Sequence, residues 1–185
     1  MNFELRDTSI QPLKVIDTFG FEDTRGSFTR LFCANELHNV IGDRKIVQIN
    51  HSITNEIGAL RGMHFQYPPG AELKLIRCIR GRVWDVAVDL RKNSNTFLKW
   101  HAEELDYENK SMMLIPEGFA HGFQVLEGPA EMLYLHTNYY DPRLESGIHF
   151  ADPRVNINWP LKITEISVRD ASRPNIDDNF QGINL

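Results

Sequence analysis

The chain has 185 residues, a length that suits one domain with a substantial core. Apolar residues make up 42% of it and charged residues 24%, which is a globular composition and excludes a disordered chain. A formal net charge of −5 argues against non-specific binding to nucleic acid. We therefore expect one domain over residues 1–185 that binds no nucleic acid, although a local cluster of Arg and Lys would still suit a phosphate-bearing small molecule.

The sequence carries no signal for export or for a membrane. Its first fifteen residues, MNFELRDTSIQPLKV, contain no basic segment followed by an apolar run. No stretch approaches the ~20 apolar residues of a membrane span. Cys33 and Cys78 are too few for a disulfide framework or a zinc site. We expect a cytoplasmic protein with no membrane association.

In chain order, the first expected element is a short helix over residues 34–40. From residue 44 onward, short runs rich in β-branched and aromatic residues are separated by Gly, Pro and Asn, which predicts closely spaced strands. Turn residues predict hairpins at Gly81 and at 127–129. Strand signals fade beyond Pro153, so we expect this tail to wrap or cap a β-sandwich or barrel.

The segment WDVAVD, residues 84–89, alternates strictly and therefore predicts a strand with Asp85 and Asp89 on one face. An acidic strand face usually meets solvent. In a barrel, however, the same face can line the lumen where a ligand binds. The sequence does not decide between solvent and the lumen.

Two histidines stand in patterns typical of a cupin barrel. LRGMHFQ contains His64, and PEGFAHGF places His121 after a Pro-x-Gly turn. Metal-binding cupins generally have His-x-His in the first pattern, but Gln66 stands at the second position here. Because a catalytic metal usually has three protein ligands, we expect neither a metal nor any other cofactor.

A barrel without a metal needs acid–base chemistry from its own side chains. His64 can act as a general base near neutral pH. Lys74 can hydrogen-bond an oxygen on which negative charge develops, and Tyr134 can supply a proton. From spacing alone, an ordinary strand histidine is the preferred interpretation of His64 and a core tyrosine that of Tyr134, so these residues by themselves define no reaction.

Long motifs in a fixed order carry more information. They are GALRGMHFQ, LKLIRCIRGRVWDVAVDLRKNSNTF, LIPEGFAHGFQVL, NYYDPRLESGI and DPRVNINWP. Together they resemble the dTDP-4-dehydrorhamnose 3,5-epimerase family, with similarity from Phe21 through Asp170. The resemblance implies an all-β cupin-type jelly-roll barrel with a few short helices, usually a homodimer. It also implies a nucleoside-diphosphate 4-keto-6-deoxyhexose as substrate, inverted at C5, C3 or both by metal-free acid–base chemistry.

The resemblance implies roles for particular residues. His64 is similar to the family's base and Tyr134 to its acid. Asp170 is similar to the carboxylate that pairs with the histidine, and Lys74 to the residue that steadies the enolate oxygen. Positions that match substrate contacts are Arg25, Gln48, Asn50, Arg61, His121 and Glu145, with Arg169 where the family commonly has Lys.

Arg30 is the clearest departure from the family pattern. It stands in DTRGSFTR where the family has a Glu that accepts a hydrogen bond from thymine. Arg has only donors, so it cannot make that bond, whereas cytosine or guanine acceptors suit it. This favours a CDP-linked or, less so, a GDP-linked substrate inverted at C5 alone. Alternatively, Arg30 points away while Phe28 and Tyr140 stack on thymine; both interpretations stay open.

Three other functions compete with this interpretation. A metal-dependent cupin enzyme needs a third ligand near His64 and His121. A non-catalytic sugar-nucleotide binder would be more natural if the acid or the base were missing. A 3,4-ketoisomerase on the same barrel is disfavoured by the presence of both Lys74 and Tyr134.

Overall fold

The computed structural model describes residues 2–185; Met1, the first residue of the expected domain, lies outside the described residues. The secondary structure is almost entirely β, which confirms the expected class. The strands are β1 Phe3–Asp7, β2 Lys14–Thr18, β3 Gly20–Asp23, β4 Gly26–Thr29, β5 Gln48–Thr54, β6 Leu60–Gln66, β7 Lys74–Asp89, β8 Trp100–Asp106, β9 Ser111–Ile115, β10 Phe119–His136 and β11 Glu145–Gly147. The helices of the described chain are α1 His38–Ile41 and α2 Val168–Ala171, both too short to cross a membrane.

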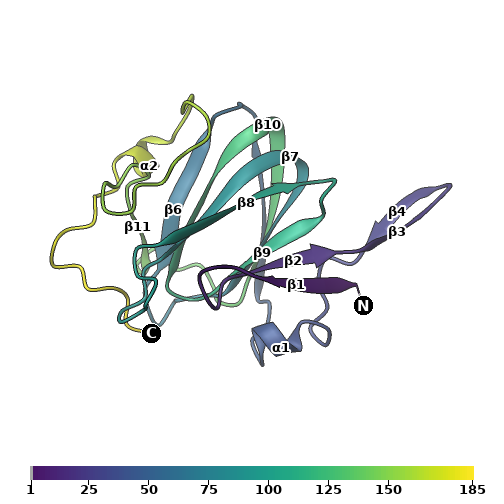
Figure 1. Cartoon of the computed structure of the whole chain (residues 1–185), viewed down its shortest axis with the longest axis horizontal. Coiled ribbons are helices and arrows are strands. Elements are labelled where there is room, and N and C mark those ends of the chain that lie inside the picture. Colours follow the sequence, from purple (N-terminus) through teal and green to yellow (C-terminus); the bar gives the residue numbers. More distant parts are fainter. Residues whose placement is uncertain (1) are drawn as a thin grey trace.

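Two long strands organise the barrel (Figure 1). β7 and β10 pair antiparallel along most of their 16 and 18 residues. The first part of β7 also pairs with β9 and its second part with β8. Similarly, the first part of β10 pairs with β6 and its second part with β5. The two strands therefore run through both layers, one formed with β1, β2, β9 and β5 and the other with β8, β6 and β11.

The predicted hairpins at Gly81 and at 127–129 are wrong. Both segments lie inside the long strands, where the pairing register shifts between Val125 and Glu127 and again between Glu127 and Glu131. Gly81 has φ of 71°, and a Cβ there would lie 2.4 Å from the Glu127 carbonyl oxygen. Glycine thus bends two paired strands together from one layer into the other rather than reversing the chain.

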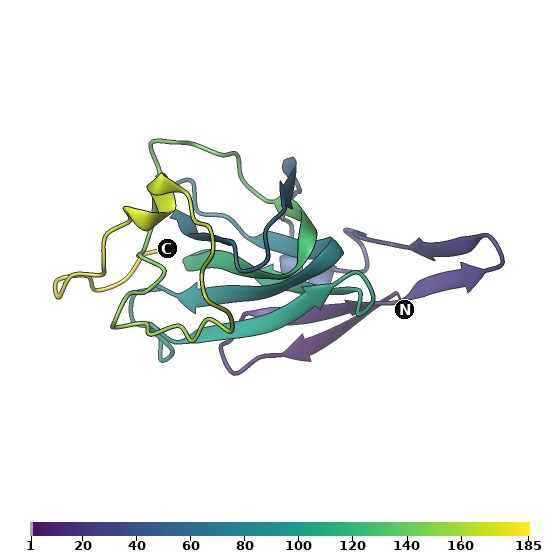
Figure 2. The ribbon, with the colours of Figure 1, turned by 90° about the horizontal axis from the view of Figure 1, so that it is seen from above.

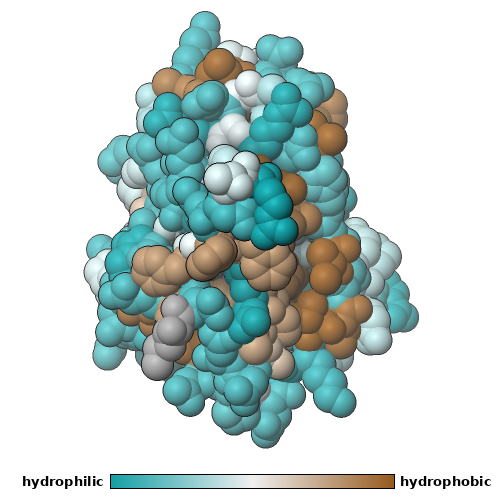
Figure 3. Space-filling view, turned by 90° about the vertical axis from the view of Figure 1, so that its right-hand side faces the viewer, coloured by the Kyte–Doolittle hydropathy of each residue, from teal (hydrophilic) through white to brown (hydrophobic). Residues whose placement is uncertain are grey.

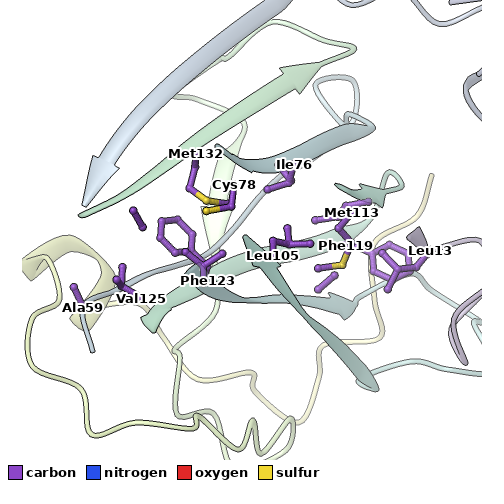
Figure 4. Close-up of a cluster of buried hydrophobic side chains, with 14 of the residues drawn as sticks. Leu13, Ala59, Ile76, Cys78, Leu105, Met113, Phe119, Phe123, Val125 and Met132 are labelled. Carbon is purple, nitrogen blue, oxygen red and sulfur yellow. The ribbon is translucent and has the colours of Figure 1, made fainter. Parts of the chain in front are cut away.

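Apolar side chains from both layers fill one half of the barrel (Figure 4). Ile76 and Cys78 of β7 pack with Phe123 and Met132 of β10, and all are buried. The sequence did not decide whether the acidic face of β7 meets solvent or the barrel interior; in the structure this face is buried. Asp85 and Asp89 are both 0% exposed, so this face looks into the barrel rather than into solvent.

The tail beyond Pro153 covers the barrel, as expected. It has little regular structure, but Ile166 forms a bridge to Leu60 of β6, and α2 lies against the same strand. The expected helix at 34–40 is shorter and begins later, as α1.

The β3–β4 hairpin projects away from the barrel (Figures 1 and 2). It forms a separate two-stranded sheet that pairs with none of the other strands. Phe21 and Phe28, which pair across it, are both 74% exposed. Figure 3 looks onto this end of the molecule and shows hydrophobic residues gathered across the face. Aromatic side chains this exposed usually mark an interaction surface.

Candidate active site

One cavity of about 300 Å³ opens where the two layers meet α2 and the loop before β11. Its walls come from β5, β6, β7 and β10. The residues that line it include nine of the fourteen site residues expected from the sequence, namely Asn50, Arg61, His64, Lys74, His121, Tyr134, Tyr140, Glu145 and Asp170. Most are polar, so the cavity suits a polar ligand.

His64 and Asp170 form a hydrogen-bonded pair on one wall. His64 Nε2 lies 2.7 Å from Asp170 Oδ1, and the Gly62 N–H donates to Asp170 Oδ2 at 3.2 Å. Burial alone would raise the pKa of Asp170, but the interactions with His64 and the hydrogen bonds from Gly62 and Ser167 together lower the pKa below its usual value. The carboxylate therefore fixes a proton on Nε2 and leaves Nδ1 able to accept one.

Tyr134 enters the cavity from the other layer, on the part of β10 that pairs with β5. Its hydroxyl lies 2.9 Å from Ser52 Oγ. Burial raises the pKa of Tyr134 to about 12, so the phenol holds its proton at neutral pH. Tyr134 can therefore act as a proton donor. The sequence did not single out its neighbour, Ser52.

Lys74 stands beside two residues that the sequence analysis missed. Lys74 Nζ lies 3.3 Å from Glu72 Oε1, and His136 Nδ1 lies 2.8 Å from Glu72 Oε2. All three are less than a tenth exposed. The sequence does not single out Glu72, because it lies just before β7 and not in the strand pattern. It does not single out His136 either, because a histidine at the end of an apolar strand has no distinctive spacing.

His121 is paired with a buried acid. Its Nε2 lies 2.8 Å from Asp85 Oδ1, while Asp85 Oδ2 has no hydrogen-bond partner within residues 2–185. Burial raises the pKa of Asp85. In the described chain, no three His, Cys, Asp or Glu side chains are arranged to hold a metal ion.

The mouth of the cavity carries a cluster around Glu145. Its carboxylate forms ion pairs with Arg169 and Arg173 and accepts a hydrogen bond from the Tyr140 hydroxyl at 3.1 Å. Arg173 was not expected from the sequence. Gln48 does not line the cavity; it contacts Asn50 and the backbone of Tyr140 instead.

Three expected substrate-binding residues lie away from the cavity. Arg25 and Phe28 are on the β3–β4 hairpin, where Arg25 pairs with Asp23. Arg30 follows β4 and forms an ion pair with Glu36. None of the three contributes to the cavity of its own chain.

These features define a cupin-type barrel with a histidine–carboxylate pair, a protonated tyrosine and a buried lysine around one polar cavity. Comparison with known proteins then gives the family. The family profile described as dTDP-4-dehydrorhamnose 3,5-epimerase matches residues 7–178. The chain is 43% identical over 164 residues to the dTDP-4-dehydrorhamnose 3,5-epimerase of Shigella flexneri, covering 88% of this chain and 90% of that protein. It belongs to this family, whose members are isomerases.

Solved structures agree with the sequence comparison. The Legionella pneumophila dTDP-6-deoxy-D-glucose-3,5-epimerase in complex with dTDP-4-keto-L-rhamnose superposes with a TM-score of 0.90 at 37% identity, covering 98% of each chain. A 3'-monoepimerase from Streptomyces bikiniensis in complex with dTDP-quinovose gives 0.85 at 29% identity, covering 92% of this chain and 86% of that chain.

The alternative of a CDP- or GDP-linked substrate, based on Arg30, is not favoured. Both of these structures hold thymidine-linked ligands. The ion pair with Glu36 also engages the guanidinium that was expected to contact the base.

Proposed function

We propose that this protein inverts carbons 3 and 5 of a dTDP-linked 4-keto-6-deoxyhexose, with His64 as base and Tyr134 as acid. The observation that carries the proposal is the convergence of the His64–Asp170 pair and the Tyr134 phenol on one cavity from different layers of the barrel. A sugar ring bound between them would meet the base on one face and the acid on the other.

The chemistry follows from the 4-keto group. A C–H bond next to a carbonyl is acidic because the carbanion delocalises onto the oxygen as an enolate. Nδ1 of His64 takes the proton while Asp170 stabilises the resulting imidazolium. The Lys74 ammonium stabilises the developing oxyanion. Tyr134 then returns a proton to the opposite face, and the configuration at that carbon is inverted. The same arrangement serves C3 and C5, since both flank the carbonyl.

Residues at the cavity mouth suit the nucleotide part of the substrate. Arg61 lies on the wall, and Arg169 is half-exposed beside Glu145. Guanidinium groups bind phosphate oxygens through paired hydrogen bonds. We assign the diphosphate to this side of the cavity.

Incubation with a dTDP-linked 4-keto-6-deoxyhexose in D₂O tests the function. We expect NMR spectroscopy to show deuterium at C3 and C5 together with inverted product. Deuterium at one carbon alone would restrict the reaction to that carbon, and no deuterium at either would overturn the proposal.

We further propose that the single domain of residues 1–185 acts as a homodimer in which each β3–β4 hairpin reaches the partner's cavity. Two observations support this. Phe21 and Phe28 are too exposed for a free hairpin, and Arg25 matches a substrate-contacting position although it lies away from its own cavity. Ile49 and Ile53 of β5 are also exposed and would extend the apolar interface.

Complementation between two defective variants, assayed at a substrate concentration well below KM, tests the exchange of hairpins. In a hybrid dimer of Arg25→Ala and His64→Ala chains, reciprocal exchange leaves one cavity with both native residues. About half of the wild-type activity per dimer should return. If each hairpin serves its own chain, both cavities stay defective, and the hybrid shows only the weak low-substrate activity of the Arg25→Ala chain.

We also propose a cytoplasmic location. The support is the pair of free thiols, since Cys33 and Cys78 form no disulfide with one another and Cys78 is buried in the core. Fractionation of the source cells with an antibody would test it; recovery outside the cytoplasm would contradict it.

A further inference from the structure

A chain of hydrogen bonds runs along the Lys74 side of the cavity, and its polarity is fixed from one end. That end is the backbone N–H of Tyr140, which can only donate, and it donates to Gln48 Oε1 at 3.1 Å. The Gln48 amide is thereby oriented, and its Nε2 donates to Asn50 Oδ1 at 3.2 Å. The Asn50 amide is oriented in turn, so that its Nδ2 donates to His136 Nε2 at 3.3 Å.

The polarity of this chain determines the state of His136. Because Nε2 accepts from Asn50, its lone pair is engaged and the ring proton must be on Nδ1. That proton is donated to Glu72 Oε2 at 2.8 Å. His136 is therefore the neutral Nδ1–H tautomer, held between an amide and a carboxylate.

Glu72 connects His136 to Lys74. With one oxygen engaged by His136, the other faces the Lys74 ammonium at 3.3 Å. Burial raises the pKa of Glu72, but its interactions with His136 and Lys74 together lower the pKa below its usual value, so the carboxylate is ionised at neutral pH. Lys74 is also the first residue of β7 and pairs directly with His136, the last of β10. The ion pair thus lies where the backbone positions of both residues are fixed.

We propose that Glu72 is a positioning residue that holds the Lys74 ammonium toward the enolate oxygen, and that the chain of Gln48, Asn50 and His136 fixes Glu72. The inference rests on the proposed function, because it assumes that Lys74 stabilises the enolate. An ammonium has three donors. Binding one of them to Glu72 leaves the others for substrate, and it makes a buried charge tolerable before the oxyanion forms.

This assignment changes the expected role of two residues. Gln48 and Asn50 match substrate-contacting positions, but the structure gives their side chains partners within the protein. Gln48 lies outside the cavity lining and reaches the reaction through Asn50 and His136. Their effect on catalysis is therefore expected to pass through Lys74.

The variant Glu72→Gln tests the positioning role, with Glu131→Gln as matched control. Glu131 also pairs with a histidine of β5, His51 at 3.1 Å, but it does not line the cavity. We expect Glu72→Gln to lower kcat ~10-fold or more with KM within about twofold, because an interaction realised in the transition state is lost. Glu131→Gln should match the wild type. Wild-type kcat in Glu72→Gln, or a raised KM with kcat unchanged, would overturn the inference.

A second measurement needs no variant. ¹⁵N NMR of the histidine rings should place the His136 proton on Nδ1, and a proton on Nε2 would overturn the hydrogen-bond chain. The two proposals remain distinguishable. Failure of the wild-type protein to exchange deuterium would refute the function, whereas normal exchange with an unaffected Glu72→Gln variant would refute only the role of Glu72.

Discussion

The cavity and the β3–β4 hairpin contrast within one chain. In the cavity, residues from six distant segments converge, and each key side chain has a partner: Asp170 for His64, Glu72 for Lys74 and Ser52 for Tyr134. On the hairpin, Arg25 contacts only a neighbour two residues away, and Phe28 is exposed. The cavity is pre-organised within one chain, whereas the hairpin exposes its aromatic side chains and is tied to the barrel by the ion pair of Glu22 with Lys110.

The contrast suggests a division of roles: the cavity holds the groups that carry out the chemistry, and the hairpin holds groups that contribute to substrate binding. Groups that move protons must be held to within a fraction of an ångström, which suits paired strands and buried contacts. Groups that only bind the nucleotide can come from a projecting element. Changes to the cavity groups that move protons should therefore affect kcat, and changes on the hairpin should affect KM.

The largest effect is expected for His64→Ala. Removal of the base should lower both deuterium exchange and turnover by ~10³-fold or more. Exchange and product formation measured together by NMR will test this. Turnover near the wild-type level would exclude His64 as the base.

Tyr134→Phe should separate proton removal from inversion. The variant keeps the ring in place but lacks the proton, so inversion should fall ~10²-fold while His64 still exchanges a proton on its own face. The comparison is between the rates of deuterium uptake and of product formation. Equal losses in the two rates would contradict the division of roles.

Asp170→Asn should reduce activity ~10–100-fold and make the protein less stable at neutral pH. The pKa of Asp170 is lowered in the folded state, so its stabilising contribution is present above the unfolded value of about 3.9 and is lost as the pH falls through the folded value. Urea denaturation should show a loss of about 1 kcal/mol at pH 7 that shrinks as the pH falls below the unfolded value of about 3.9. A difference that does not change with pH would contradict this account.

Arg25→Ala should have a smaller effect, of a different kind. We expect KM for the dTDP-sugar to rise about 10-fold with kcat nearly unchanged, because the substrate contact proposed for Arg25 is lost. Steady-state kinetics at several substrate concentrations will show it. A fall in kcat with constant KM would place Arg25 in the chemistry instead.

Arg30→Gln should have the smallest effect. Its guanidinium already pairs with Glu36 at the surface, so KM should change by less than about twofold. Calorimetric titration with dTDP and CDP provides the check. Loss of dTDP binding, or a preference for CDP in the wild type, would restore Arg30 as a reader of the base.

The sequence predicted the fold class and most of the cavity because its motifs lie on paired strands, where register brings His64 of β6 beside His121 of β10. It missed the long bent strands. A glycine at a bend within a strand cannot be distinguished from a glycine in a hairpin turn when the pairing strand is unknown. It also missed Glu72 and His136, which meet only after β7 and β10 have paired. The hairpin residues were identified by motif, but a single sequence does not place them relative to the cavity.

A crystal structure with a bound dTDP-linked 4-keto-6-deoxyhexose tests the central claim most directly. The account predicts His64 Nδ1 and the Tyr134 hydroxyl within ~3.5 Å of one ring carbon, on opposite faces of the sugar. Both groups on the same face, or a sugar bound out of reach of either, would contradict it.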